Sequence, residues 1–246
     1  MLELTTFSIA ARCPRSGMLG IAVATAVPAV GAICAHARAG AGAIATQSWT
    51  NPYLGIDGLD LLAAGVGAEA ALERLIAGDP KPELRQLGIV DAAGASAAWS
   101  GPGCTPWFGH LTGPDHAVQG NMLVGEATVR AMGAAFVGSA ALDLPERLLI
   151  ALEAGQAAGG DKRGRQSAAL KVMHTEAWPY LDLRVDEHRH PIPELRRIFE
   201  IARQQLLPFV ERLPTRARPE GTVSERAAAV LMTPPPYRPG GGGGAP

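Results

Sequence analysis

The alternation of apolar and polar positions near the amino terminus predicts a β-hairpin. A first strand from Leu4 to Arg12 places Thr6 and Ser8 on one face and apolar side chains on the other. Pro14 to Gly17 has the composition of a turn, and an apolar stretch from Met18 to Ala26 follows it. The two strands are therefore expected to pair in antiparallel fashion.

The rest of the chain predicts further short strands separated by pairs of helices. Strands are expected at Ala41–Gln47, Gln86–Asp91, Ala95–Ser100, His116–Gln119, Ser167–Met173 and Tyr180–Val185. Helices are expected at Gly55–Ala64, Ala68–Ala77, Glu126–Val137, Asp143 to about Gly159, and Pro193 to about Leu207. Within this scheme His116–Gln119 is an edge strand, residues 101–114 are loop, and Asp143 is an N-cap with Glu146 as its capping-box partner.

This order of elements predicts the class of fold. Hairpins that alternate with helix pairs favour antiparallel sheets covered by helices, whereas βαβ units would alternate single strands with single helices. Two antiparallel sheets between two helical layers satisfy the order. We therefore expect an α+β protein built as a four-layer αββα sandwich.

The carboxyl-terminal part of the chain has a different composition. Residues 214–246 hold 13 of the chain's 50 Gly and Pro residues, including the run from Gly240 to Gly244. Such a segment buries too little apolar surface to offset its ordering entropy. We expect one domain over residues 1–213 and a disordered Pro/Gly-rich tail over 214–246. A short helix around Thr222–Met232 is the alternative for part of that tail.

Composition and charge exclude several classes of protein. The 246 residues are 47% hydrophobic, which excludes a wholly disordered chain. The net charge of −1 provides no global attraction to nucleic acid or to an anionic membrane. Residues 18–35 carry no charge, but Pro28 interrupts them, so buried strands explain them better than a membrane span or a signal peptide.

The three cysteines indicate neither a metal site nor a disulfide framework. Cys13, Cys34 and Cys104 are far apart and odd in number, and no CxxC or His/Cys spacing for zinc occurs. The six histidines also lack helical metal-ligand spacing, and we expect them at the surface or satisfied in the core. We expect a cytoplasmic protein with neither metal nor cofactor.

The densest group of polar residues lies between a predicted helix and a predicted strand, at 159–167. Asp161 and Arg163 can form a bidentate pair or face a substrate, and Gln166 and Ser167 add amide and hydroxyl groups. The order of residues is not that of a phosphate-binding P-loop. The alternative is a helix-ending turn with a solvated ion pair.

Three more groups of polar residues are candidates for chemistry. Asn121, in Gln119-Gly120-Asn121, can aim donors at an oxyanion, or it can belong to a plain turn. Gln47 and Asn51 lie where a buried strand ends, in a segment that is otherwise read as loop. Thr6 opens the first strand, where threonine is common, and its hydroxyl needs an adjacent base to act as a nucleophile.

Several of these segments resemble one known family. The likeness runs from about residue 5 to 200. It is carried by Thr6–Ala10, Ala45–Gln47, Arg85–Gly88, Gln119–Asn121, Glu153–Gln156 and Gly159–Ser167. They are similar to domain-of-unknown-function family 1028, which is grouped with the N-terminal-nucleophile hydrolases. The resemblance implies the same αββα sandwich that the order of elements predicts.

The resemblance also implies a chemistry. In N-terminal-nucleophile hydrolases an N-terminal hydroxyl attacks a carbonyl carbon, its own α-amine takes the proton, and an oxyanion hole holds the developing charge. The resemblance thus implies hydrolysis of a small amide or other C–N bond. The candidate catalytic residues are Thr6, Asn121 and Asp161. The candidate substrate-binding residues are Gln47, Asn51, Arg163, Gln166 and Ser167.

One departure from the family pattern leaves alternatives open. Met1 to Thr5 precede Thr6, and Leu2 is too large for ordinary methionine removal, so Thr6 has no free amine in the chain as written. Either residues 1–5 are cleaved, or the true start lies elsewhere, or the protein binds a small ligand or acts in an assembly without catalysis. A further alternative moves catalysis to the loop of Asp161, Arg163 and Ser167. The partner is expected to be a small-molecule substrate, and the high apolar fraction is compatible with a homo-oligomer.

Overall fold

The predicted hairpin forms the middle of a six-stranded antiparallel sheet. The structure, a computed structural model, describes residues 3–4 and 6–232. The strand order is β11-β10-β3-β2-β9-β8. These strands are β2 (Thr6–Arg12), β3 (Leu19–Thr25), β8 (Gly109–Gly113), β9 (His116–Gly120), β10 (Ser167–Met173) and β11 (Leu181–Val185).

A second antiparallel sheet has five strands. Its order is β1-β5-β6-β7, and β4 also pairs with β5. The strands are β1 (Glu3–Leu4), β4 (Ala35–Arg38), β5 (Gly42–Trp49), β6 (Arg85–Asp91) and β7 (Ser96–Ser100). Two short 3-10 turns, Val30–Ala32 and Pro82–Leu84, precede β4 and β6.

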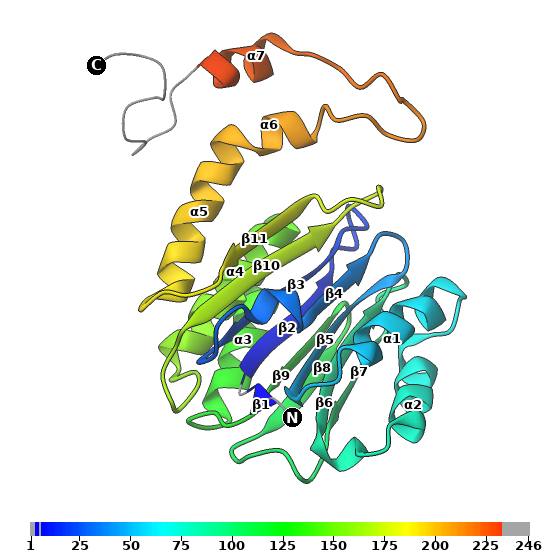
Figure 1. Cartoon of the computed structure of the whole chain (residues 1–246), viewed down its shortest axis with the longest axis vertical. Coiled ribbons are helices and arrows are strands. Elements are labelled where there is room, and N and C mark those ends of the chain that lie inside the picture. The colour runs from blue at the N-terminus through cyan, green and yellow to red at the C-terminus, as the bar shows by residue number, and fades with distance from the viewer. Residues whose placement is uncertain (1–2, 5, 233–246) are drawn as a thin grey trace. The chain divides into compact units, whose positions relative to one another are not determined.

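Helices cover the outer face of each sheet, which completes four layers (Figure 1). Helices α1 (Tyr53–Ala63) and α2 (Ala68–Gly78) pack on the five-stranded sheet, where Leu59, Leu62 and Leu75 join Ile44 in one buried cluster. Helices α3 (Ala127–Gly138) and α4 (Leu144–Ala157) pack on the six-stranded sheet. The predicted αββα sandwich is confirmed, because each of these four helices packs its apolar side against a face of a sheet.

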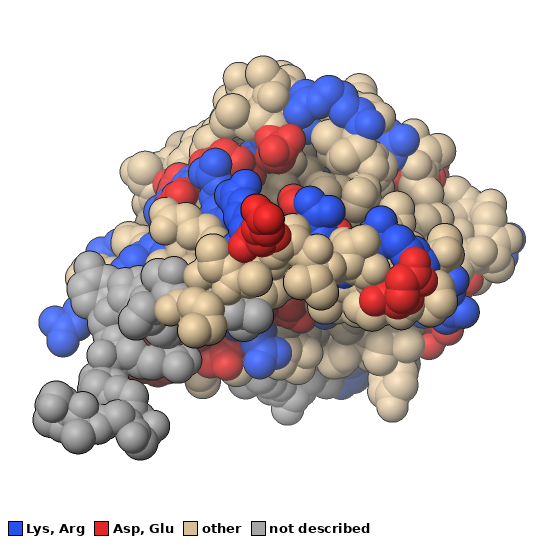
Figure 2. Space-filling view, turned by 90° about the horizontal axis from the view of Figure 1, so that it is seen from above, with Lys and Arg blue, Asp and Glu red and all other residues tan. Residues whose placement is uncertain are grey.

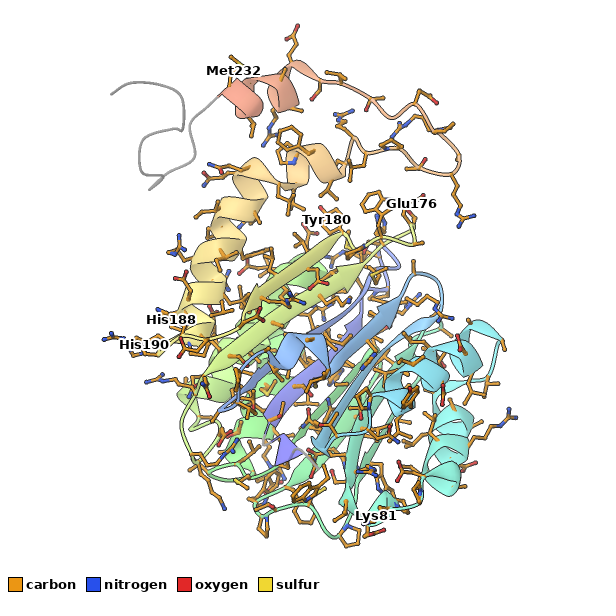
Figure 3. All side chains as sticks on the ribbon, in the orientation of Figure 1. Lys81, Glu176, Tyr180, His188, His190 and Met232 are labelled. Carbon is orange, nitrogen blue, oxygen red and sulfur yellow. The ribbon has the colours of Figure 1, made fainter. Side chains whose placement is uncertain are left out.

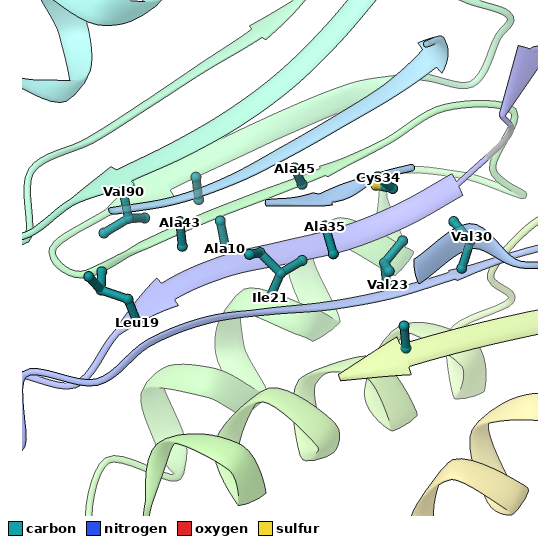
Figure 4. Packing of buried hydrophobic residues seen from close by; sticks show 12 residues of the cluster. Ala10, Leu19, Ile21, Val23, Val30, Cys34, Ala35, Ala43, Ala45 and Val90 are labelled. Atoms are coloured by element: carbon teal, nitrogen blue, oxygen red, sulfur yellow. The ribbon is translucent and has the colours of Figure 1, made fainter. Parts of the chain in front are cut away.

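The inner faces of the two sheets meet in a core of small side chains. Figure 4 shows Ala10 of β2 and Ile21 of β3 facing Ala43, Ala45 and Val90 of the other sheet. All five residues are completely buried. Alternation along β2 places Thr6 and Ser8 on the same inner face as Ala10. The layer between the sheets is therefore apolar at one end and polar at the other.

Four local expectations differ from the structure. Leu4 belongs to β1 of the second sheet, because it pairs with Ser48, and not to the first strand of the hairpin. Strand β8 occupies part of the predicted loop 101–114, and β9 is consequently not an edge strand, because it pairs with β2 on one side and β8 on the other. Strand β4 was not predicted, since its four residues are too few for their alternation to identify a strand.

The capping-box prediction at the start of α4 is also wrong. Asp143 is the N-cap residue, but its side chain makes no capping hydrogen bond. Glu146 instead accepts a hydrogen bond from Arg196 at 2.6 Å, and Glu153 of the same helix binds that guanidinium as well. A tertiary ion pair, invisible in the local sequence, thus takes the side chain that the local motif would use.

The chain divides into two compact units, with the boundary after Ile198. Helix α5 (Pro191–Gln205) crosses that boundary in sequence, and α6 (Leu207–Val210) and α7 (Glu225–Met232) belong to the second unit. Helix α7 lies within the stretch for which a short helix was the alternative to disorder. Residues 214–224 of the predicted tail contain neither helix nor strand, and residues 233–246 lie outside the described residues.

The charged surface and the length of the helices can be compared with the protein classes that composition excluded, namely binders of nucleic acid or anionic membranes and membrane-spanning proteins. On the face shown in Figure 2, Lys and Arg lie interspersed with Asp and Glu instead of gathering in one basic patch. Within residues 3–4 and 6–232, no helix has the length and apolar character needed to cross a bilayer.

Candidate functional site

The polar end of the layer between the sheets is the candidate site. Six completely buried polar residues gather there from β2, β5, β6 and the end of β9. They are joined by side-chain hydrogen bonds and are Thr6, Ser8, Gln47, Gln86, Gln119 and Asn121. Thr25 of β3 lies directly opposite Thr6 in the sheet. We call these seven residues the inter-sheet polar cluster.

Thr6 lies at the first position of β2, with its hydroxyl inside the cluster. Its Oγ1 lies 3.4 Å from Oγ1 of Thr25. Its carbonyl oxygen accepts hydrogen bonds from the backbone N–H of Asn121, at 3.0 Å, and from Nε2 of Gln47, at 3.2 Å. Two of the predicted site residues therefore hold the backbone of a third.

The segment before Thr6 belongs to the other sheet. Glu3 pairs with Trp49 and Leu4 with Ser48 of β5, so the chain passes from the five-stranded sheet to the six-stranded sheet just before Thr6. The nitrogen of Thr6 is consequently a peptide nitrogen in this chain. An amide has no lone pair basic enough to take a proton from the hydroxyl, as a free α-amine can.

Gln86 is the centre of the hydrogen-bond network, although it was not among the predicted site residues. Its Oε1 accepts from Nε2 of Gln47 at 2.8 Å and from Nδ2 of Asn121 at 2.9 Å. Its Nε2 donates to Oγ of Ser100 at 2.8 Å and to the carbonyl of Gly120 at 2.8 Å. The available signal was a glutamine in an otherwise apolar strand, which must find buried partners.

Gln119 and Ser8 extend the network along β2. Nε2 of Gln119 donates to Oγ of Ser8 at 2.6 Å, and that hydroxyl donates to Oε1 of Gln47 at 2.6 Å. The side chain of Gln119 lies across Gly88, where a Cβ atom would stand only 1.8 Å from Oε1 of Gln119. Gly88 therefore makes the room that the glutamine occupies.

Two acceptors in the cluster have no hydrogen-bond partner. Oε1 of Gln119 and Oδ1 of Asn121 are buried and unpaired among the described residues. A buried polar atom without a partner costs about 1–3 kcal/mol, so such atoms are rare unless water or a ligand pairs with them. These two oxygens are therefore the acceptors of the cluster that other residues of the described chain leave unused.

Backbone strain also concentrates at the cluster. Ser48 and Met122 have positive φ angles of 66° and 51°, although neither is glycine. Each costs about 1–3 kcal/mol and persists because the surroundings hold it in place. Ser48 follows Gln47 and Met122 follows Asn121, so both strained residues flank side chains of the cluster.

Asp161 organises the predicted glycine-rich loop. Its Oδ2 accepts from the backbone N–H of Ala26 at 3.2 Å, and its Oδ1 accepts from the N–H of Arg163 at 2.8 Å. The carboxylate is fully buried, whereas the Arg163 side chain is 37% exposed. Asp161 therefore fastens the loop to the end of β3, and the guanidinium of Arg163 reaches solvent.

Ser167 and Gln166 fix the neighbouring turn. The Ser167 hydroxyl donates to the carbonyl of Val27 at 2.6 Å and accepts from the N–H of Val30 at 3.2 Å. Ser167 also lies opposite Thr25 in the sheet, so Thr6, Thr25 and Ser167 form one row across three strands. The backbone of Gln166 donates to the carbonyl of Thr25 at 2.8 Å.

Asn51 lies apart from the cluster, on the helix side of the five-stranded sheet. Its Nδ2 donates to Oδ2 of Asp79 at 2.8 Å, and its Oδ1 accepts from the N–H of Tyr53 at the start of α1. Arg85 completes this group by an ion pair to Asp79 at 3.0 Å. Burial raises the pKa of Asp79, but hydrogen bonds from Arg85, Asn51 and Lys81 outweigh burial and lower it overall.

A thiol and an imidazole adjoin the cluster. Sγ of Cys34 lies 3.9 Å from Oε1 of Gln47, and complete burial raises the pKa of this thiol to about 12, so it stays protonated and unreactive near neutral pH. Nδ1 of His110 lies 2.9 Å from Oγ of Ser100, which joins it to Gln86. Burial lowers the pKa of His110, which keeps the ring neutral at pH 7.

The remaining histidines do not gather around a metal. His188 and His190 lie near one another ahead of α5 (Figure 3), with Nδ1 of His188 accepting from the N–H of His190. No group of three or more His, Cys, Asp or Glu side chains with metal-binding geometry occurs in the part of the chain that the structure describes.

Comparison with known proteins places this fold in a family. The model described as "Family of unknown function (DUF1028)" matches residues 6–195. Protein SPO2555 from Silicibacter pomeroyi, a DUF1028 protein of known crystal structure, has 31% sequence identity to this chain. The two structures match with a TM-score of 0.82, and the match covers 89% of this chain and 100% of that chain. Comparison with curated proteins finds no match. Since the matched residues make up most of the sequence, the chain belongs to the DUF1028 family of unknown function.

Proposed function

We propose that this protein is an N-terminal-nucleophile hydrolase that cleaves a small amide or other C–N bond once residues 1–5 have been removed. The observation that carries the proposal is the position of Thr6. Its hydroxyl lies at the start of an inner strand of a two-sheet sandwich, within a buried polar cluster. The family match also begins at Thr6.

The proposed first half of the reaction needs the new α-amine. With residues 1–5 gone, the α-amine of Thr6 has a pKa near 8 and accepts the proton from Oγ1. Oγ1 attacks the carbonyl carbon of the substrate and forms a tetrahedral oxyanion. The oxyanion collapses to an ester as the C–N bond breaks, and the leaving amine takes the proton that the α-amine had accepted.

Water completes the proposed reaction. A water molecule gives a proton to the α-amine and attacks the ester carbon. The acid product leaves as Oγ1 recovers its proton. No cofactor is needed for either half, because the nucleophile and the base belong to one residue.

The hydrogen-bond network divides the supporting roles. Both hydrogens of the Gln47 amide are engaged, one by the Thr6 carbonyl and one by Gln86, so Gln47 positions Thr6. Nδ2 of Asn121 donates one hydrogen bond among the described residues, to Gln86, and its second hydrogen is available for another acceptor. Asn121 is therefore the better candidate oxyanion donor. Arg163, which reaches solvent beside buried Asp161, suits a polar group of the substrate.

The proposal is tested by comparing two starts of the chain. A chain that begins at Thr6 is expected to hydrolyse members of a panel of small amides. Its Thr6→Ala counterpart should lose turnover while it keeps its fold, and Thr6→Ser should retain part of it. Intact mass of the purified natural chain should show loss of residues 1–5. An active chain that retains Met1 to Thr5 and tolerates Thr6→Ala would refute the Thr6 mechanism.

A second candidate function is binding without catalysis. It is favoured by the pairing of Glu3 and Leu4 with β5, which leaves Thr6 a peptide nitrogen and a buried hydroxyl. In that case the unpaired oxygens of Gln119 and Asn121 receive donors from a ligand. A metabolite that raises the melting temperature, with no turnover in either start of the chain, would support binding.

The proposal also includes a cellular location and an oligomeric state. Cys13, Cys34 and Cys104 are buried, which suits the reducing cytoplasm. A homo-oligomer remains part of the proposal, and light scattering on the purified chain measures it directly.

A further inference from the structure

A cavity lies at the end of β2 that is farthest from Thr6. It has a volume of about 380 Å³ and forms where the β2–β3 and β8–β9 turns meet the end of α3 and the first turn of α4. Its polar lining comes from Arg15, Asp115, His116 and Arg147, and its apolar lining from prolines, Phe136 and the last residues of α3. Six residue steps along the strand separate Arg12 from Thr6, or about 20 Å.

Arg147 is buried in the wall of this cavity without a carboxylate partner. Only 6% of the residue is exposed, and its guanidinium carbon lies 3.8 Å from the centre of the Phe136 ring. Nη2 donates to the carbonyl of Phe136 at 3.2 Å, while Nε is buried without an acceptor. No Asp or Glu among the described residues forms an ion pair with it.

Arg85, the other buried arginine among the described residues, has a carboxylate partner. Arg85 is 5% exposed and is paired with Asp79 at 3.0 Å. A buried charge without its counter-ion costs several kcal/mol, so an uncompensated arginine is uncommon unless it serves a ligand. Burial, together with the charge of Arg15, lowers the pKa of Arg147, although the nearby Cys13 and Asp115 offset part of this shift.

The surroundings of Arg147 add positive charge. Arg15 donates to the backbone carbonyls of Ala141 and Leu142 just beyond α3 and has no carboxylate partner among the described residues. Asp115, the acid of the cavity wall, is paired with Arg12 at 2.9 Å. The carbonyl end of a helix supplies only about half a negative charge, which two guanidinium groups exceed.

His116 offers a further hydrogen-bonding atom. Its Nδ1 lies 2.9 Å from the carbonyl of Pro114 and must therefore carry a hydrogen. Its ring packs beside Phe136, with centroids 5.2 Å apart. The other ring nitrogen, Nε2, has no hydrogen-bond partner among the described residues.

From this arrangement we infer that the cavity binds a small organic carboxylate, anchored by Arg147. The carboxylate of the ligand supplies the negative charge that Arg147 lacks. Nη1 can donate to it, since Nη1 has no acceptor among the described residues. The prolines and Val137 cover the hydrocarbon part of the ligand, and Phe136 supports the guanidinium of Arg147 from behind. A carboxylate suits the site better than a phosphate dianion, because one buried guanidinium and apolar walls offer few donors for a larger hydrated anion. The site is independent of the proposed reaction at Thr6.

The test measures binding of named carboxylates to the full chain. Benzoate and cyclohexanecarboxylate are expected to raise the melting temperature and to bind in calorimetry at pH 7, whereas neutral benzamide should do neither. Arg147→Met should weaken carboxylate binding about tenfold or more, because a charge-assisted hydrogen bond is lost. The control is Arg130→Met, which removes the same charge from the exposed face of α3 and should leave binding unchanged.

Stability of the ligand-free variants separates this inference from a purely structural role. If Arg147 is kept for a ligand, Arg147→Met should be as stable as the wild type or more so, since it removes an uncompensated buried charge. If that variant fails to fold, Arg147→Lys keeps the charge and should still bind carboxylate, more weakly. Equal shifts with benzamide, tighter binding of inorganic phosphate, or no carboxylate binding to the wild type would overturn the inference. A change of oligomeric state in Arg147→Met, without any effect on carboxylate binding, would overturn it too.

Discussion

Individual side chains in the layer between the sheets depend on one another for space and for hydrogen bonds. Gln119 lies where Gly88 has no side chain, and Gln86 pairs with both Gln47 and Asn121. Each amide is buried, so the loss of one partner leaves another unpaired. The same reasoning applies to the ion pair of Asp79 and Arg85 on the other face of β6.

Gly88→Ala is expected to destabilise the protein by about 1–3 kcal/mol. The added methyl group would collide with the Gln119 amide in a layer that cannot expand, because both sheets pack against it. Urea unfolding measures the change. Gly78→Ala is the control, because its Cβ would point into open space, and it should change stability by less than about 0.5 kcal/mol. Equal effects of the two substitutions would contradict the packing described here.

Asp79→Asn should lower the free energy of unfolding at pH 7 by about 3–5 kcal/mol, because it leaves the buried guanidinium of Arg85 without its counter-ion. Asp60→Asn breaks an exposed pair with Arg38 and should cost less than about 1 kcal/mol. Chemical denaturation of both variants provides the comparison. A cost for Asp79→Asn no greater than that of Asp60→Asn would show that the pair does not stabilise the fold.

The Asp79 pair also predicts a dependence on pH. The pKa of Asp79 is lower in the folded protein than its unfolded value near 4. Its contribution is therefore fully present above pH 4 and is lost as the pH falls through the folded pKa. The stability difference between wild type and Asp79→Asn should shrink below about pH 4. A difference that stays constant from neutral to acid pH would contradict the lowered pKa.

Among the elements, strand pairing and helix docking have different sequence signals. The helix pairs and the hairpins follow from apolar periodicity, and they were predicted nearly to their bounds. Strand β4 and the place of β9 inside the sheet were not, because four alternating residues are too few to identify a strand and because β8 lies in a Gly/Pro-rich segment that reads as loop. Pairing between distant strands needs the partner strand, which local sequence does not contain.

Helix α5 is fastened at its start by Arg196, which binds Glu146 and Glu153 of α4. Arg196→Ala should therefore increase hydrogen–deuterium exchange in the first turns of α5, since its two tertiary ion pairs are lost. Arg203→Ala is the control, because Arg203 forms an exposed ion pair with Glu200 of the same helix. If the two variants exchange alike, the α4 contacts do not hold the helix.

The molecule as a whole joins its two sheets through the first residues of the chain. Strand β1 adds two pairs to the five-stranded sheet, whereas β2 runs through the core of the other. The amino terminus therefore contains a strand with few pairing contacts, β1, followed at once by a strand that pairs on both sides, β2. That division matters for the proposed function, which requires residues 1–5 to be removed without unfolding the sandwich.

A chain that begins at Thr6 should keep its free energy of unfolding to within about 1 kcal/mol, because a two-residue strand pairing contributes little. A chain that begins at Ser8 also loses Phe7, which is 1% exposed, and should be less stable by about 3–5 kcal/mol. Denaturant unfolding of both shortened chains measures this. A large loss on removing residues 1–5 alone would argue against their cleavage in the native protein.

Local pattern determined the sandwich itself, because period-2 and period-3.6 alternation decides which face of each element is apolar and hence how the layers stack. It also indicated most of the polar residues at the strand ends, including Thr6, Gln47, Asn121 and Asp161. Only the tertiary structure placed Gln86 at the centre of the network, Asn51 outside it, and Arg147 in a cavity without a counter-ion. These outcomes depend on contacts between residues far apart in the chain, and a hydrogen-bond partner or a counter-ion is specified by position in space.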